Sequence, residues 1–212
     1  MIDKIKILVR KSPLWPLIRP RRTHVYGVGP PCTGTKSLAQ LFGRYRSFHE
    51  MYPEQIANLL SSNCSEKIFL DQIRERDRRH RPECEVGYFL VYICNALADE
   101  FQEAKFVSTV RPPRPWLRSI IDHFINRPRS ECSESLRWLR DYSFGSIPDR
   151  YSVEEEPLRR HNLHSLSGYL SYWAFHYRTV LDGLPSKRRL LIPTQDLSKS
   201  TGRIANFAGI SD

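Results

Sequence analysis

The sequence predicts a single α/β domain whose mostly parallel sheet is flanked by helices. Short β-branched and aromatic runs alternate along the chain with segments whose apolar residues recur at helical spacing. That alternation is typical of a parallel sheet covered on both faces. The chain has 212 residues, of which 40% are apolar and 11% aromatic, and this is enough for one domain with a hydrophobic core.

The first predicted strand and the turn after it are the most informative stretch. Residues 24–28 are apolar with β-branched and aromatic side chains, residues 29–34 mix Gly, Pro and Thr, and residues 35–44 show helical spacing. A strand that feeds a helix through a tight turn exposes backbone N–H groups, which attract phosphate or sulfate. Side-chain donors at the same place come from Thr33, Thr35, Lys36 and Ser37.

The turn differs from the Walker A motif, in which Lys directly follows the second Gly. Thr35 stands here between Gly34 and Lys36. An ordinary strand–helix turn and an anion site are both consistent with the glycine spacing. The cluster of donors after Gly34 favours the anion site.

The remaining elements follow the same periodicities. Strands are predicted over residues 47–50, 105–110 and 189–193, and residues 86–101 fit a strand edge that passes into an amphipathic helix. Helices are predicted over residues 54–60, 114–125 and 165–181, with a last helix that ends near Phe207. The charged run 74–82 mixes both signs and favours a solvated helix end or loop. Residues 127–160 are irregular, as is typical of an insertion that covers a substrate.

Ligands of open parallel sheets bind outside the carboxyl ends of the strands. The turn after Val28, the pair His49 and Glu50, and Arg111 each follow a predicted strand. The sequence therefore predicts that these groups meet at one edge of the sheet.

Charge and cysteine content narrow the class of protein. The net charge of +10 indicates an anionic partner, such as a nucleotide, a nucleic acid, an acidic glycan or a membrane surface. The five cysteines are scattered and form no C-x-x-C pair, so neither a disulfide framework nor a zinc site is indicated and a reducing compartment is expected.

Residues 1–22 form a predicted basic N-terminal arm ahead of a domain over residues 23–212. The apolar run in the arm is too short to span a bilayer and has no signal-peptide cleavage site. A cytoplasmic protein is expected, with weak surface attachment through Trp15, Leu17 and Ile18 as the alternative.

Three separated segments together resemble the sulfotransferases that use 3′-phosphoadenosine-5′-phosphosulfate (PAPS). Residues 29–38 are similar to the family's 5′-phosphosulfate loop, residues 105–119 to its 3′-phosphate segment, and residues 189–210 to its closing strand and helix. The resemblance implies a P-loop-like sulfotransferase architecture. It also implies transfer of a sulfuryl group from PAPS to the hydroxyl of a glycan, a small molecule or a protein side chain.

The resemblance also implies roles for individual residues. The phosphosulfate would lie on the loop, and Lys36 would neutralise the oxygens that gain charge during transfer. Arg111 offers a planar fork for the 3′-phosphate, and Ser119 a hydroxyl for the same group. The residues assigned to the phosphosulfate are Cys32, Thr33, Gly34, Thr35, Lys36 and Ser37.

A base must take the proton of the acceptor hydroxyl. Glu50 is favoured over His49, because adjacent side chains of an extended segment point to opposite faces. Glu83, Glu85 and His123 are reserve candidates. The sequence departs from the family at Cys32, where Arg or Lys is usual, and at Pro113, where Asp is usual.

Two other functions remain open from the sequence. One is a P-loop-type kinase or NTPase, against which stand the imperfect Walker A motif and the absence of a predicted strand that ends in Asp. The other is a catalytically weakened nucleotide-binding protein, which the Cys32 departure favours. Neither a metal cofactor nor a nucleic-acid partner is expected for the sulfotransferase, and the sequence does not fix the acceptor or the oligomeric state.

Overall fold

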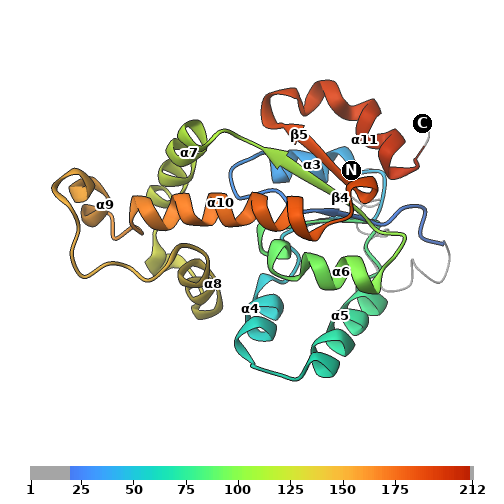
Figure 1. The fold of residues 1–212 in the computed structure, drawn as a ribbon, viewed down its shortest axis with the longest axis horizontal. Helices are drawn as coiled ribbons and strands as arrows, with labels where there is room; N and C mark the ends of the chain where they lie inside the picture. The colour runs from blue at the N-terminus through green and yellow to red at the C-terminus, as the bar shows by residue number, and fades with distance from the viewer. Residues whose placement is uncertain (1–19, 211–212) are drawn as a thin grey trace, which may run out of the picture.

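A five-stranded parallel sheet organises residues 20–210, the part of the chain that the computed structural model describes (Figure 1). The strands lie in the order β2-β3-β1-β4-β5, and every neighbouring pair is parallel. This confirms the predicted α/β fold class. Most of the predicted basic arm lies outside the described residues. The strands are β1 Val25–Gly27, β2 Ser47–His49, β3 Cys84–Val86, β4 Lys105–Val110 and β5 Arg189–Pro193.

Helices connect the strands and cover both faces of the sheet. The α-helices are α3 Thr35–Leu41, α4 Pro53–Ser61, α5 Glu66–His80, α6 Cys94–Glu100, α7 Pro113–Ile125, α8 Glu134–Phe144, α9 Glu156–Arg160, α10 Leu166–Gly183 and α11 Thr201–Ala208. A 3₁₀ helix, η1, spans Tyr88–Ile93 and leads from β3 into α6. Within residues 20–210, no helix has both the length and the apolar content that crossing a membrane requires.

The strand predicted at the start of residues 86–101 lies earlier and more centrally than expected. It is β3, which pairs with both β1 and β2. Two acidic residues, Glu83 directly before β3 and Glu85 within it, interrupt the apolar pattern that a buried strand usually shows. Glu85 is 0% exposed because Arg76 of α5 forms two hydrogen bonds to its carboxylate, each 2.5 Å long.

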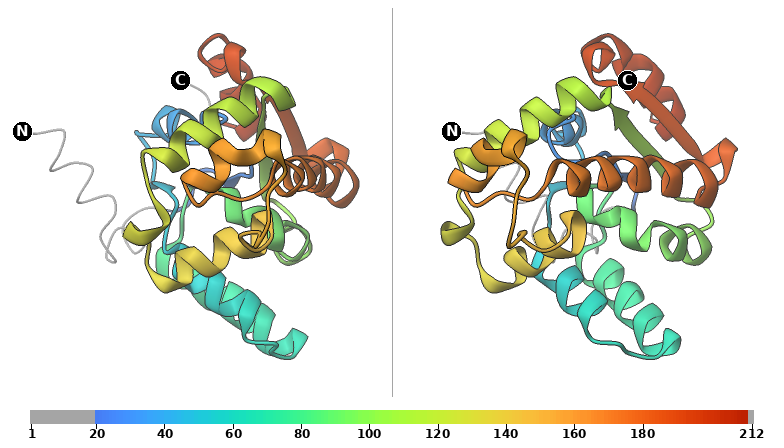
Figure 2. Two further views of the ribbon diagram at one scale, coloured as in Figure 1. Left: turned by 90° about the vertical axis from the view of Figure 1, so that its left-hand side faces the viewer. Right: turned by 60° about the vertical axis from the view of Figure 1, so that its left-hand side comes forward.

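The segment predicted to be irregular, residues 127–160, contains α8 and α9. The hydroxyl of Ser133 caps α8 by accepting the backbone N–H of Leu136. Figure 2 shows α8 and α9 beyond the end of the sheet, with α8 beside α4 and α10. This part of the chain therefore adds a helical layer next to the carboxyl ends of the strands.

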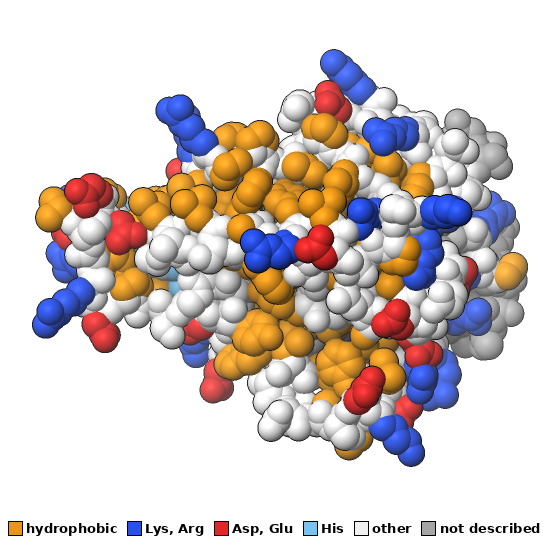
Figure 3. Space-filling view, in the orientation of Figure 1, with side chains coloured by type: hydrophobic (Ala, Val, Ile, Leu, Met, Phe, Trp, Pro, Cys, Tyr) orange, Lys and Arg blue, Asp and Glu red, His pale blue; other side chains and the backbone are white. Residues whose placement is uncertain are grey.

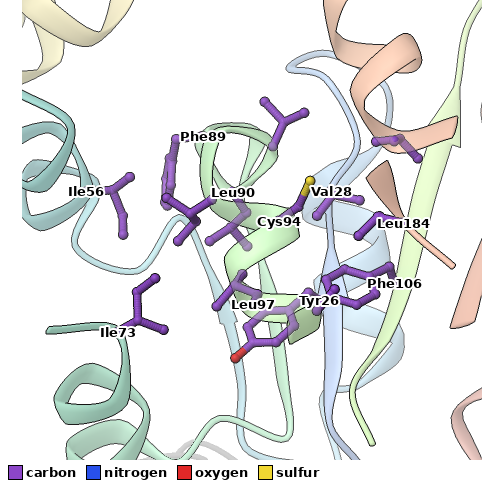
Figure 4. Packing of buried hydrophobic residues seen from close by; sticks show 14 of the residues in the cluster. Tyr26, Val28, Ile56, Ile73, Phe89, Leu90, Cys94, Leu97, Phe106 and Leu184 are labelled. Atoms are coloured by element: carbon purple, nitrogen blue, oxygen red, sulfur yellow. The ribbon is translucent and has the colours of Figure 1, made fainter. Parts of the chain in front are cut away.

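The core is built by the alternation of side chains along the strands. Val25 and Val107 pack toward α3 and α11, whereas Tyr26 and Phe106 pack toward the other face. Figure 4 shows Tyr26 and Phe106 beside apolar side chains of α6, and Ile56 and Ile73 further out on α4 and α5. The hydrophobic clusters on both faces explain why strands of only three residues are stably placed.

The long helix α10 has one buried and one exposed side. Tyr169, Tyr172 and Tyr177 are buried, as the sequence predicted for most of its aromatic residues. Phe175 is 43% exposed, and Figure 3 shows hydrophobic side chains gathered on both sides of this helix. The helix thus links the sheet to α7 and α8 through its buried aromatic side.

The charged run 74–82 is the end of α5 and the turn after it, as predicted, but part of it faces inward. Besides the Arg76–Glu85 pair, Asp77 accepts a hydrogen bond of 2.6 Å from Arg21. Arg76 also donates to the carbonyl of Met51 at 2.7 Å. These contacts tie α5 to the sheet, so this part of the run is structural.

We expect Arg76→Met to destabilise the protein by about 3–5 kcal/mol, because it leaves the buried Glu85 carboxylate without its partner. Arg74→Met on the same helix is the matched control. Arg74 pairs with Glu100 at the surface, and its loss should cost less than about 1 kcal/mol. Urea unfolding of both variants checks this, and equal small losses would contradict the structural role of the buried pair.

Candidate active site

The loop between β1 and α3 is fixed by three side-chain donors from distant parts of the chain. His176 of α10 donates from Nε2 to the carbonyl of Val28 at 2.5 Å, and Trp116 of α7 donates from Nε1 to the carbonyl of Pro31 at 2.9 Å. The hydroxyl of Thr194, which follows β5, donates to the carbonyl of Thr33 at 2.9 Å. The loop conformation therefore depends on α7, α10 and the end of β5.

Thr33 is wholly buried and its hydroxyl is occupied inside the loop. It donates to the carbonyl of Pro30 at 2.6 Å and lies 2.6 Å from the hydroxyl of Thr109. Gly29 permits this close approach, since a Cβ there would lie 2.2 Å from the Thr109 hydroxyl. What Thr33 offers to a ligand is thus its backbone N–H.

The loop ends in a geometry that leaves N–H groups free. Gly34 has φ +91°, a left-handed conformation that glycine adopts at low cost, and α3 begins directly after it. The first N–H groups of a helix have no acceptor within the helix. Those of Thr35, Lys36 and Ser37 also have no acceptor elsewhere in residues 20–210. The side chains of Lys36 and Ser37 are exposed beside them.

His49 and Glu50 both lie near the start of α3. The ring of His49 is 3.1 Å, Nε2 to Oγ1, from Thr35. Burial lowers the pKa of His49, the charge of Lys36 lowers it further, and the neighbouring Glu50 opposes both. Glu50 has φ +51°, so it is not extended and the expected alternation of side chains does not apply to it. The geometry therefore keeps both residues as base candidates.

Cys32 is the point at which most of the predicted site residues meet. Burial raises the pKa of its thiol to about 11, and the charge of Glu50 adds to this rise. Arg111, a hydrogen bond with Ser119 and Arg127 act in the opposite direction and lower the pKa. These interactions bring the loop, the end of β2 and the start of α7 together, as the sequence predicted. The thiol stays protonated at neutral pH, so it carries no charge toward a ligand.

The backbone N–H and carbonyl of Arg111 are both hydrogen-bonded, whereas its guanidinium is not paired with an acidic side chain of the described residues. Its N–H donates to the hydroxyl of Tyr177 at 3.2 Å, and its carbonyl accepts from Trp173 Nε1 at 3.0 Å. The guanidinium forms no ion pair with any carboxylate of the described chain. A half-buried, unpaired Arg at a strand end is suited to bind an anion.

Two reserve base candidates are structural residues. Glu83 accepts the backbone N–H groups of Arg22 and Arg46, and Glu85 is paired with Arg76. His123 instead lies on the same side of α7 as Ser119, near Arg127 and Arg140. Within the described ranges, no group of three or more His, Cys, Asp or Glu side chains is placed to hold a metal ion.

The sequence did not single out several residues of the site. His176, Trp116 and Thr194 support the loop, and Tyr88 lies near Glu50, whose charge raises its pKa in addition to the larger effect of burial. The sequence signal for Trp116 was its place on the apolar face of a predicted helix, which does not distinguish a loop contact from ordinary core packing.

Comparisons with known proteins agree with this fold. No family model matches the chain, and no curated protein matches it in sequence. Among solved structures, a sulfotransferase from Alicyclobacillus acidocaldarius is similar, with a TM-score of 0.53 and 16% sequence identity, over 90% of this chain and 82% of that one. The likeness shows that the two proteins share a fold over most of their length.

We expect His176 to make stability depend on pH. Burial lowers its pKa to about 4, below the usual value of about 6.5 for an unfolded chain. The unfolded chain therefore takes up a proton at this His before the folded protein does. The free energy of unfolding is not reduced by His176 above pH 6.5, and it falls as the pH drops toward 4, with a slope of up to about 1.4 kcal/mol per pH unit.

His176→Gln keeps an N–H donor for Val28 but does not titrate, so its stability should fall less between about pH 6.5 and pH 5 than that of the parent protein. Urea unfolding at both pH values measures the difference, with exposed His161→Gln as the control. Parallel pH profiles of the parent and His176→Gln would contradict the assignment.

Proposed function

We propose that this chain is a sulfotransferase that moves a sulfuryl group from PAPS to the hydroxyl of an acceptor. The observation that supports it best is the convergence on Cys32 of Arg111, Ser119 and Glu50, the three groups that the resemblance assigned to donor and base. The sulfotransferase fold of a similar structure adds support for the class of reaction.

The residues present fit the donor well at one end and less well at the other. The free N–H groups of Thr35, Lys36 and Ser37 suit the 5′-phosphosulfate, and the unpaired Arg111 with Ser119 suits the 3′-phosphate. Cys32 adds no charge, because its thiol is protonated. Lys36 is exposed at the start of α3 and is the cation of this loop that would neutralise the phosphosulfate.

The donor supplies an activated sulfuryl group, and the protein supplies charge and a base. Glu50 takes the proton of the acceptor hydroxyl as the new O–S bond forms. The bond between sulfur and the bridging oxygen breaks, and 3′-phosphoadenosine-5′-phosphate (PAP) leaves with the electron pair of that bond. The loop N–H groups and Lys36 stabilise the negative charge that grows on the phosphate side.

His49 is the alternative base, and its lowered pKa keeps the ring neutral and able to accept a proton at neutral pH. Its contact with Thr35 nevertheless favours a role in holding the start of α3. The carboxylate of Glu50 accepts no hydrogen bond from any group in residues 20–210, which leaves it free for an acceptor.

We expect Arg111→Ala to weaken the binding of PAP by about 10- to 150-fold, which corresponds to about 1.5–3 kcal/mol for hydrogen bonds to a charged group. Adenosine-5′-phosphosulfate, which lacks the 3′-phosphate, should lose far less affinity. Isothermal calorimetry measures both ligands, and Arg79→Ala at the other edge of the sheet is the control.

Equal losses for the two ligands would show that Arg111 has a structural role only. Binding of ATP with Mg²⁺ by the parent protein, without binding of PAP, would instead favour a kinase or NTPase. Binding of PAP without transfer to any acceptor would favour the catalytically weakened protein.

We expect Glu50→Gln to reduce the transfer rate by about 10²–10⁴-fold, because the amide keeps the shape of the side chain but cannot take a proton. The affinity for PAP should change little, since Glu50 is not proposed to contact the donor. Single-turnover transfer from ³⁵S-labelled PAPS to a panel of sugar and phenol hydroxyls measures the rate. His49→Gln is the comparison, and a dead His49→Gln beside an active Glu50→Gln would reverse the two roles.

A further inference from the structure

Two further cations lie near the candidate active site. Arg127 follows the carboxyl end of α7, whereas Arg111 precedes its amino end, and Arg140 lies on α8. Arg127 acts electrostatically on both Cys32 and His123, and Arg140 acts on both His123 and Tyr88. Glu50 completes the connection, because its charge acts on both Cys32 and Tyr88. These electrostatic interactions define a group that we call the charged ring, which consists of Cys32, Glu50, Tyr88, His123, Arg127 and Arg140.

Helix geometry explains how α7 contributes to the charged ring. Ser119 and His123 are four residues apart, so they lie on one side of α7, and Arg127 follows two residues after the helix ends at Ile125. Ser119 at one end of this row contacts Cys32. The row thus leads from the loop outward to Arg127, which is exposed.

Packing fixes Arg140 beside Arg127. The guanidinium of Arg140 lies 4.2 Å from the ring centre of Phe124, and both of its Nη atoms are 3.3 Å from the carbonyl oxygen of Arg127. This cation–π contact and the two long hydrogen bonds hold the planar fork in place. Several of its N–H groups are left to donate to a ligand.

The two guanidinium groups have no carboxylate partner in residues 20–210. The neighbouring Asp141 is bound by Arg129, and Glu50 is the carboxylate of the charged ring. Elsewhere in the described chain, half-buried arginines such as Arg21 and Arg76 are paired with acids. Two cations that act on the same residue, His123, and have no carboxylate of their own favour the binding of an anion.

We propose that Arg127 and Arg140, with an N–H of His123, bind an anionic group of the acceptor, a carboxylate or a sulfate, and so direct its hydroxyl toward Glu50. The inference rests on the proposed function and adds the acceptor class to it: an anionic molecule such as an acidic sugar. Glu50 acts on Cys32, as Arg127 does, and on Tyr88, as Arg140 does, so the base and the two cations surround the same residues.

Arg127 also acts on Cys32, so a competing role is to replace the cation that the loop lacks at that position. In that case Arg127 would bind the donor. Arg140 separates the two roles, because it acts on Tyr88 and His123 and its guanidinium is held against Phe124 and the carbonyl of Arg127.

The test uses the full chain saturated with PAP, which blocks the donor site. Inorganic sulfate is then titrated, followed by p-nitrophenyl β-D-glucuronide and its neutral match, p-nitrophenyl β-D-glucoside, with binding measured by calorimetry. We expect saturable sulfate binding and a glucuronide affinity at least about 10-fold above that of the glucoside. Arg127→Gln and Arg140→Gln should each abolish sulfate binding and reduce the preference to less than about 3-fold, while PAP affinity in Arg140→Gln stays unchanged.

Arg79→Gln is the control, because Arg79 is exposed near the end of α5 and so lies at the opposite edge of the sheet. Sulfate binding that is absent, or that persists in both variants, would overturn the inference, as would equal affinity for the two glycosides. A loss of PAP affinity in Arg140→Gln would also overturn it and assign the cations to the donor. If PAP does not bind the parent protein at all, the proposed function fails. The loss of sulfate binding in Arg127→Gln and Arg140→Gln, but not in Arg79→Gln, then still decides whether the anion site exists.

Discussion

The candidate active site depends on the hydrogen bonds that hold the carbonyl groups of the β1–α3 loop. Val28, Pro31 and Thr33 each present a carbonyl to a side-chain donor on another element. Because side chains of α7, α10 and the end of β5 bind the carbonyl groups of the loop, its N–H groups face away from those elements, toward the carboxyl edge of the sheet. The arrangement also explains why α10 is so aromatic, since Tyr172 packs on Trp116 and lies 3.1 Å from the ring of His176.

Charge is distributed differently at the two edges of the sheet. Near the amino-terminal edge Arg21 is paired with Asp77, and against the middle of β3 Arg76 is paired with Glu85, so those cations are neutralised within the fold. Near the carboxyl edge, Arg111, Arg127 and Arg140 have no acidic partner among residues 20–210. The net charge of +10 therefore does not describe a uniformly basic surface. Part of it is concentrated where an anionic donor and an anionic acceptor would bind.

The sequence predicted the fold class and the meeting of the loop with Arg111 and Glu50, because those signals are local or follow from the parallel sheet. It could not predict His176 on Val28, since these residues are 148 positions apart and a buried His resembles any other core residue in a helix. It placed β3 too late, because the burial of Glu85 depends on Arg76 from another element. Arg140 was hidden for the same reason, in a segment whose helix the sequence did not show.

Backbone conformation is the last part of the site that a side-chain pattern cannot reveal. Cys32 and Glu50 both have positive φ, at +62° and +51°, a region in which non-glycine residues are strained by about 1–3 kcal/mol each. Glu50 is held there because its N–H donates to Val86 at 2.7 Å, which continues the β2–β3 pairing by one residue before the chain turns. The turn places Glu50 at the same edge as His49 and brings its charge to Cys32 and Tyr88. Relaxing Glu50 to an extended conformation would break this geometry, so the strain at this residue is what joins the end of β2 to the charged ring.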